Sequence, residues 1–173
     1  MYKIRKNFPI WTPHVTVGAV IAREFPEGTR YLMVWERTRK GVKLNQPAGH
    51  WECDESLVDA VKREVMEESG FEFTPSSLLG VYVSDRWEKD ITYLRFAFIG
   101  SVSENAITDR LDDDIISAEW LSYDEIMRHQ NMHRNPIVVQ CLNDYRSGRS
   151  LDLDHVMDLR GGNNEKKKSC GGN

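Results

Sequence analysis

The sequence has none of the features that would place the chain in a membrane, on nucleic acid or around a structural zinc ion. No apolar run approaches the ~20 residues of a membrane-spanning helix, and the opening stretch MYKIRKNF lacks the apolar segment of a signal peptide. The net charge of −4 gives no basic surface for nucleic acid or for an anionic membrane. Cysteines number three, and they lack the paired spacing of a zinc site. We therefore expect a cytoplasmic protein that binds a small molecule rather than nucleic acid or membrane, as a monomer or a homodimer.

The composition that remains is that of one folded domain. The chain has 173 residues, 40% hydrophobic and 29% charged, which suffices for a buried core under a polar surface. We expect an amino-terminal extension at residues 1–12, the domain at 13–150 and a carboxy-terminal segment at 151–160. Residues 161–173 are rich in glycine, asparagine and lysine, which predicts a disordered tail.

Strand-like and helix-like segments are mixed along the chain, which predicts an α+β fold with a mixed sheet between helices. Alternating or β-branched stretches predict strands at 14–22, 30–38, 78–88, 91–102 and 118–122. We expect the third and fourth strands to form a hairpin that turns near Lys89 and Asp90. Capping residues and helical periodicity predict helices at 56–69, 122–129 and 135–148.

The first of these helices carries an unusual cluster of glutamates. Ser56 is placed to cap its start, and Gly70 is placed to end it in the left-handed conformation. Glu64, Glu67 and Glu68 follow the i, i+3, i+4 spacing of one helix face, where like charges repel. A bound divalent cation would relieve this repulsion, since such ions take oxygen ligands and often bridge to substrate phosphates. The alternative from these three residues alone is a solvated acidic surface.

The residues around the glutamates decide between these alternatives. The stretch reads Gly49, five residues, Glu55, seven residues, and then Arg63-Glu64-Val65-Met66-Glu67-Glu68-Ser69-Gly70-Phe71. This pattern resembles the Nudix box, the signature of the Nudix hydrolases, at every defined position. The resemblance extends over about residues 13 to 150, through PHVTVGAVIA, LNQPAGHWECDESL, FAFIG and AEWLSYDEI. His50 stands where the commonest pattern has a second glycine, and the bacterial NudJ-type phosphatases share this Gly-His pair.

The resemblance implies a Nudix fold and a divalent metal site, with Mg²⁺ as the expected ion and Mn²⁺ as a possible one. Glu64 and Glu68 correspond to the principal metal ligands of the family. The backbone carbonyl of Gly49 is expected to complete the ligand set. Glu67 is expected to be a shared ligand or the base that activates water.

Three further residues are expected to support the chemistry. Arg63 and Glu55 correspond to the pair that holds the metal-binding carboxylates in one geometry. The alternative for Arg63 is an ordinary surface ion pair, which contributes little. The acidic run at 112–114 precedes Trp120 at a distance where several Nudix enzymes place another acidic residue. Asp114 is favoured over its neighbours as an extra metal or base group, and a simple turn is the alternative.

The implied activity is hydrolysis of a P–O–P bond. NudJ-type proteins release orthophosphate from nucleoside tri- and diphosphates and from hydroxymethylpyrimidine diphosphate. An ADP-sugar or dinucleotide pyrophosphohydrolase is the alternative within the enzymes. A Nudix module that binds a nucleotide without hydrolysing it is the alternative of another class, and the intact acidic positions favour the enzyme.

Substrate recognition is expected outside the box. Tyr93 and Arg95 share one face of a strand at period 2, and Arg95 needs an anionic substrate or a carboxylate as its partner. Arg37 follows a strand and is a candidate phosphate contact, with a solvated loop as the alternative. His50 is expected to bind a phosphate or to shape its loop. Aromatic side chains that could stack on a heterocycle are Tyr93, Trp35, Trp51, Trp87 and Phe96.

Overall fold

The computed structural model describes residues 11–86 and 91–160. Its strands are β1 (His14–Phe25), β2 (Gly28–Thr38), β3 (Gly41–Asn45), β4 (Ala48–His50), β5 (Phe73–Arg86), β6 (Ile91–Val102), β7 (Ile115–Ser122) and β8 (Leu151–Asp152). Its helices are α1 (Leu57–Ser69), α2 (Tyr123–Arg128) and α3 (Ile137–Arg146), with short 3-10 helices η1 (Gln130–Met132) and η2 (Leu153–His155). The predicted disordered tail at 161–173, the turn at Lys89 and Asp90, and most of the predicted amino-terminal extension lie outside the described residues.

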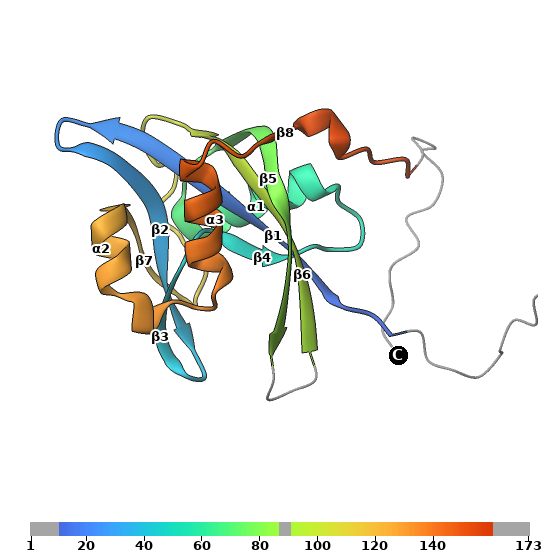
Figure 1. Ribbon diagram of the computed structural model, residues 1–173, viewed down its shortest axis with the longest axis horizontal. Coiled ribbons are helices and arrows are strands. Elements are labelled where there is room, and N and C mark those ends of the chain that lie inside the picture. The colour runs from blue at the N-terminus through green and yellow to red at the C-terminus, as the bar shows by residue number, and fades with distance from the viewer. Residues whose placement is uncertain (1–10, 87–90, 161–173) are drawn as a thin grey trace, which may run out of the picture.

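The sheet is mixed, as predicted, and the long strand β1 connects its two parts (Figure 1). Residues 14–21 of β1 pair in parallel with β6, and residues 22–25 pair antiparallel with β2. The strand order is β3-β2-β1-β6-β5-β8, with β4 paired to β1 and β7 paired to β2. Because β4 joins β1 directly before α1, the start of that helix is fixed against the middle of the sheet.

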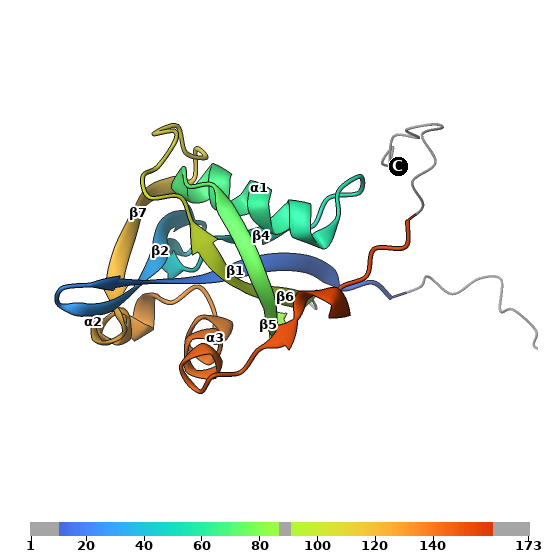
Figure 2. The same cartoon turned by 90° about the horizontal axis from the view of Figure 1, so that it is seen from above.

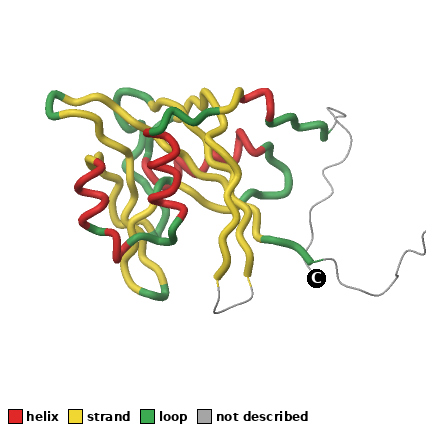
Figure 3. The backbone as a smooth tube through the Cα atoms, viewed as in Figure 1, coloured by secondary structure: helices red, strands yellow, loops and turns green. Residues whose placement is uncertain are grey.

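Helices cover both faces of this sheet. Seen from above, α1 lies on one side of the strands, and α2 and α3 lie on the other (Figure 2; Figure 3 shows the same helices in red). Each face has its own core: Val61 and Val65 of α1 pack in one cluster, and Val138 and Leu142 of α3 pack in the other. The predicted sandwich of a mixed sheet between helices is therefore confirmed. No helix within the described ranges is long and apolar enough to cross a membrane.

Helix α1 begins and ends where the sequence predicts. Ser56 is the N-cap, and its hydroxyl accepts a hydrogen bond from the backbone amide of Asp59. Gly70 has φ +74° and ends the helix in the left-handed conformation. A Cβ at Gly70 would lie 2.2 Å from the carbonyl oxygen of Thr108, so glycine is required there for space as well as for conformation. The caps set where the helix begins and ends, and the packing of Val61 and Val65 in the core sets the direction in which its glutamates point.

Two stretches differ from the sequence expectation. Strand β5 begins at Phe73, before the predicted start at residue 78, because residues 73–77 pair with β6 despite containing Pro75. Its register shifts twice along this part, which accommodates residues that fit a regular strand poorly. The stretch from 41 to 50, where the sequence predicts no strand, forms the short strands β3 and β4 on either side of Pro47. Pairing with other strands decides both cases: β5 pairs with β6, β3 with β2 and β4 with β1.

Candidate functional site

The three glutamates of α1 lie on one side of the helix but differ in exposure. Glu64 is 7% exposed and Glu68 is 9% exposed, so both carboxylates lie largely away from water. The side chain of Glu67 is 40% exposed. The helix therefore presents a buried pair of acids and a third acid at the surface.

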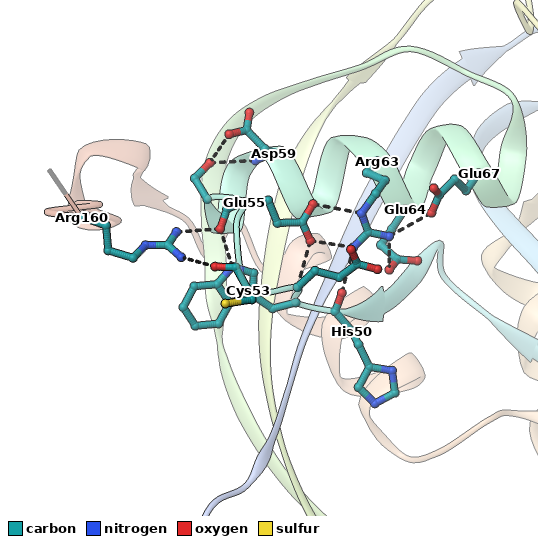
Figure 4. Close-up of polar contacts among 11 residues, drawn as sticks. His50, Cys53, Glu55, Asp59, Arg63, Glu64, Glu67 and Arg160 are labelled. Carbon is teal, nitrogen blue, oxygen red and sulfur yellow. Dashed lines mark hydrogen bonds and ion pairs between the residues drawn. The ribbon is translucent and has the colours of Figure 1, made fainter. Parts of the chain in front are cut away.

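Arg63 is the centre of the hydrogen-bond network around these acids (Figure 4). Its Nε and Nη2 donate to the two carboxylate oxygens of Glu55 at 2.9 and 2.7 Å, a bidentate contact. Its Nη1 donates to Glu64 Oε1 at 2.7 Å and to Glu67 Oε2 at 2.9 Å. Its Nη2 also donates to the backbone carbonyl of His50 at 2.9 Å. One guanidinium thus connects the helix, the loop before it and strand β4.

Burial opposes the charges of the two inner acids. It raises the pKa of Glu64, and the hydrogen bond from Arg63 offsets this in part. It raises the pKa of Glu68 well above its usual value, with the charge of Glu64 adding to the effect. By contrast, the Arg63 fork lowers the pKa of Glu55. Ionised Glu64 and Glu68 therefore lack sufficient positive charge from the protein around them.

Strand β4 approaches the acids more closely than a side chain would permit. The backbone amide of Ala48 donates to Glu68 Oε2 at 2.7 Å. A Cβ built on Gly49 would lie 2.1 to 2.3 Å from the carboxylate atoms of Glu64, so only glycine leaves that carboxylate its place. The backbone of β4 thus packs directly against the two buried acids, whose carboxylate oxygens could bind a cation.

This donor set fits a divalent cation. Hard cations take carboxylate and carbonyl oxygens, and a bound ion would supply the charge that Glu64 and Glu68 lack. The three box glutamates do not bring ligand atoms within 4.8 Å of one another. Among the described residues only Asp152, Asp154 and His155 do so, and all three are exposed. An exposed acidic group of this kind is common without an ion, so it is not taken as a site.

A cavity of about 500 Å³ opens beside the acids. Its wall includes Gly49 and Glu68, and of the predicted substrate residues it includes His50, Tyr93 and Arg95. The predicted shared face of Tyr93 and Arg95 is confirmed, since both line the cavity while Phe96 packs in the core beneath α1.

Arg95 is the charged group most deeply placed in this cavity wall. It is 7% exposed, and its Nε donates to the hydroxyl of Thr16 at 3.4 Å, a long contact. Burial lowers its pKa. Nearby, Arg134 Nη1 lies 3.7 Å from Glu36 Oε2, and both residues line the same cavity. Arg95 and Arg134 thus add two guanidinium groups to the cavity wall, and Glu36 adds a carboxylate.

His50 and Tyr93 line the cavity next to β4, and the ring of His14 contacts both of their rings. The ring centroids of His14 and His50 are 5.7 Å apart, and those of His14 and Tyr93 are 5.5 Å apart. Burial and the neighbouring charges lower the pKa of His50, so its imidazole is neutral at neutral pH. A neutral ring at this position can accept or donate one hydrogen bond to a ligand.

Two members of the acidic run line the cavity, and Arg37 contacts the third. Asp114, the favoured member of the run, lines the cavity, and so does Asp112. The amide of Asp112 donates to the carbonyl of Glu67 at 2.9 Å, which fixes this loop to α1. Arg37 is not among the described residues of the cavity wall; its guanidinium donates to the carbonyl of Asp113 at 3.2 Å. The structure thus brings Asp112 to the site and holds Arg37 on the loop.

The other aromatic candidates lie away from the cavity. Trp35 packs against the core cluster that contains α3, and its ring contacts His129 at 5.1 Å between centroids. Trp51 packs on the opposite face, in the cluster beneath α1. Trp87 lies outside the described residues.

Sequence reasoning missed Glu36, Arg134 and Asp112. Glu36 lies in β2 just after a run of buried residues. A charged residue in an otherwise apolar strand is the signal that singled out Arg95, and the same signal could have found Glu36. No local sequence pattern points to Arg134. It is brought to the site by a contact with a distant strand, in which its backbone amide donates to the carbonyl of Leu44 in β3. Asp112 could not be separated from its neighbours before the fold of its loop was known.

Comparisons with known proteins agree with this geometry. The NUDIX domain family matches residues 12–140. The chain is 34% identical over 152 residues to Phosphatase NudJ of Escherichia coli strain K12, a match that covers 87% of this chain and 94% of the relative. Thus the predicted similarity to the NudJ-type phosphatases is confirmed.

Solved structures give the same result. A NUDIX hydrolase from Nitrosomonas europaea has a TM-score of 0.79 and 44% identity, covering 85% of this chain and 97% of that chain. The NUDIX domain of Shewanella oneidensis NrtR, solved with ADP ribose, has a TM-score of 0.68 at 16% identity over 86% of this chain and 99% of that chain, which supports the fold alone. The chain is therefore a member of the NUDIX family, and it is a hydrolase that acts on phosphorus-containing anhydrides.

Proposed function

We propose that this hydrolase depends on Mg²⁺ and releases orthophosphate from nucleoside tri- or diphosphates, or from a related organic diphosphate such as hydroxymethylpyrimidine diphosphate. The observation that carries the proposal is the identity to Phosphatase NudJ over 94% of that relative. The geometry supports it, because the buried acid Glu68 and the buried Arg95 both lie on the wall of one cavity of about 500 Å³. Such a cavity can hold a phosphorylated molecule of moderate size.

The proposed metal ligands are Glu64 and Glu68, with the carbonyl of Gly49 and with Glu67 as a shared ligand or base. A bound Mg²⁺ would neutralise phosphate oxygens and lower the pKa of a bound water, and Mn²⁺ suits the same oxygen donors. Arg63 is proposed to hold the carboxylates of Glu64 and Glu67 in place through its hydrogen bonds at 2.7 and 2.9 Å. Preorganised carboxylates of this kind keep a metal site competent.

The base that takes the proton of the attacking water is proposed to be Glu67 or Asp114. One oxygen of Glu67 is bound by Arg63, and the side chain is 40% exposed, so water can reach it. Asp114 lines the cavity, as does its neighbour Asp112. Glu67→Gln and Asp114→Asn tell the two apart. The variant of the true base should lose turnover but should still be stabilised by Mg²⁺ in its folded state.

Substrate recognition is proposed to use Arg95, Tyr93 and His50. Arg95 can donate to an anionic group from within the cavity, and its long contact with Thr16 leaves its other nitrogens for a ligand. Tyr93 offers a ring face for a heterocycle, and neutral His50 offers one hydrogen bond. Arg37 stays a prediction as a phosphate contact, since reaching one requires it to leave the carbonyl of Asp113.

A product analysis tests the proposal. Purified protein is incubated with nucleoside tri- and diphosphates, pyrimidine diphosphates, ADP-sugars and dinucleotides, with Mg²⁺ and with excess chelator. The proposal expects orthophosphate from the first two groups and no turnover in chelator. A nucleoside monophosphate plus a second phosphorylated fragment would identify a pyrophosphohydrolase instead. Glu68→Gln should lose most activity and stay folded, since it keeps shape and removes one metal ligand.

The partners follow from the same reasoning. We propose a small nucleotide or organic diphosphate as the ligand, and neither nucleic acid nor membrane as a partner. Monomer and homodimer remain the two predicted states, and a cytoplasmic location remains a prediction from the sequence. Light scattering of the purified protein decides between the two states.

A further inference from the structure

The chain after α3 returns to the loop that precedes α1. Leu153 and Val156 of this returning segment pack against the core cluster beneath α1. Figures 1 and 2 both show the segment, in orange-red, next to the amino-terminal end of that helix. Its last described residue, Arg160, therefore reaches the loop at residues 51–56.

Arg160 makes several contacts with this loop. Its Nη1 donates to the carbonyl of Cys53 at 3.1 Å, and its Nη2 donates to the carbonyl of Glu55 at 2.6 Å (Figure 4). Its guanidinium carbon lies 4.9 Å from the ring centroid of Trp51, within the range of a cation–π contact. Asp158 accepts hydrogen bonds from its Nε and Nη2, which orients the guanidinium.

The same loop carries the carboxylate that positions Arg63. Residues 51–56 form no helix or strand, so the position of their backbone depends on individual contacts rather than on a regular ladder of hydrogen bonds. The carbonyl of Glu55 accepts from Arg160 and also from the indole Nε1 of Trp51 at 2.8 Å. The carboxylate of the same Glu55 accepts both hydrogen bonds of the Arg63 fork. Arg160 and Trp51 thus hold the backbone carbonyl of Glu55, while its carboxylate binds Arg63.

We propose that Arg160 is a positioning residue for the metal-binding acids. By fixing the backbone of Glu55, it fixes the carboxylate that orients Arg63. Arg63 in turn holds Glu64 through its Nη1 at 2.7 Å. Arg160 touches neither the acids nor the wall of the cavity, so it acts through these intermediates. The kinetic part of this inference rests on the proposed function, and its structural part does not.

The first test measures the loop itself in metal-free protein. Amide hydrogen exchange of residues 52–56 is compared between wild type and Arg160→Ala. We expect roughly tenfold faster exchange in the variant, since two backbone carbonyls lose a donor and the loop opens more often. Arg128→Ala is the matched control, because Arg128 is an exposed arginine on α2 whose loss should leave the loop unchanged. Equal exchange in wild type and Arg160→Ala would overturn the proposal.

The second test separates positioning from general stability. The Mg²⁺ concentration for half-maximal activity should rise roughly tenfold in Arg160→Ala, the lower end of losses when groups behind metal ligands are removed. KM for the substrate should stay unchanged, and the melting temperature should fall by no more than about 2 °C, as for a surface change. The Mg²⁺ requirement of Arg160→Lys should lie between those of wild type and Arg160→Ala, since lysine keeps the charge over Trp51 but lacks the planar fork. A lower melting temperature with an unchanged Mg²⁺ requirement would mean a purely structural role.

A third test asks whether Arg160 acts through Glu55. In a Glu55→Gln background, Arg160→Ala should add little to the Mg²⁺ requirement, because both changes act on one carboxylate. Additive effects would contradict this route. If no substrate is turned over, the proposed function fails, and hydrogen exchange still decides the structural claim.

Discussion

Replacing Gly49 with alanine tests whether the close approach of β4 to α1 sets the position of Glu64, the proposed metal ligand. The added Cβ would lie 2.1 Å from Glu64 Oε2, 2.2 Å from its Cδ and 2.3 Å from Oε1. Ordinary contact begins at 3.4 Å, so the carboxylate must retreat by about 1.3 Å, the difference between 3.4 and 2.1 Å. The change therefore acts on the position of one carboxylate.

Its effect on function should be large and its effect on stability small. A misplacement of about 1 Å in a reacting group can cost on the order of 10²-fold in rate, and we expect a loss of that size in kcat/KM. The backbone of Gly49 is outside the left-handed region, so alanine itself causes no backbone strain. The carboxylate is the flexible end of its side chain, and the loss of one hydrogen bond from Arg63 should cost about 1.5 kcal/mol, the lower end for a bond to a charged group.

The assay combines turnover with denaturation. Phosphate release is measured over a Mg²⁺ series, and the free energy of unfolding is measured by urea denaturation without metal. Gly80→Ala is the control, because its Cβ would lie 3.3 Å from the hydroxyl of Tyr82, far from the acids, and its activity should stay within about twofold of wild type. Wild-type turnover and Mg²⁺ dependence in Gly49→Ala would refute the reasoning.

Two further changes test the charge of the acids and the opposite face of the sheet. Glu64→Gln removes a proposed metal ligand and a buried charge. Without metal, the variant should therefore melt slightly higher than wild type. With Mg²⁺ at a hundredfold excess over Kd, its stability should rise by less than the about 2.7 kcal/mol expected for wild type. Parallel melting shifts in the two proteins would exclude Glu64 as a ligand. Tyr82→Phe removes a 2.8 Å hydrogen bond to the buried carboxylate of Asp144 and should lose about 1.5 to 3 kcal/mol in urea denaturation. Activity should be unchanged because neither Tyr82 nor Asp144 lines the cavity, and a loss of turnover would contradict that placement.

Local chemistry in the sequence determined the part of the site that lies on one element. Ser56 and Gly70 set the ends of α1, and between those ends the helical repeat alone places Glu64 and Glu68 on one face. Period 2 likewise put Tyr93 and Arg95 on the same side of β6. These features depend on residues a few positions apart, so they can be read without knowing the rest of the fold.

Tertiary structure alone decided which distant groups join them. Arg134 reaches the cavity through a backbone contact with β3, and Arg160 reaches Glu55 across 105 positions of the chain. Packing of the loop at 112–114 against the rest of the fold likewise places the carbonyl of Asp113 next to Arg37 and brings both Asp112 and Asp114 to the cavity wall. Contacts of this kind form when sheet and helices pack, and no local pattern encodes them, because the residues involved are neighbours only in the folded chain.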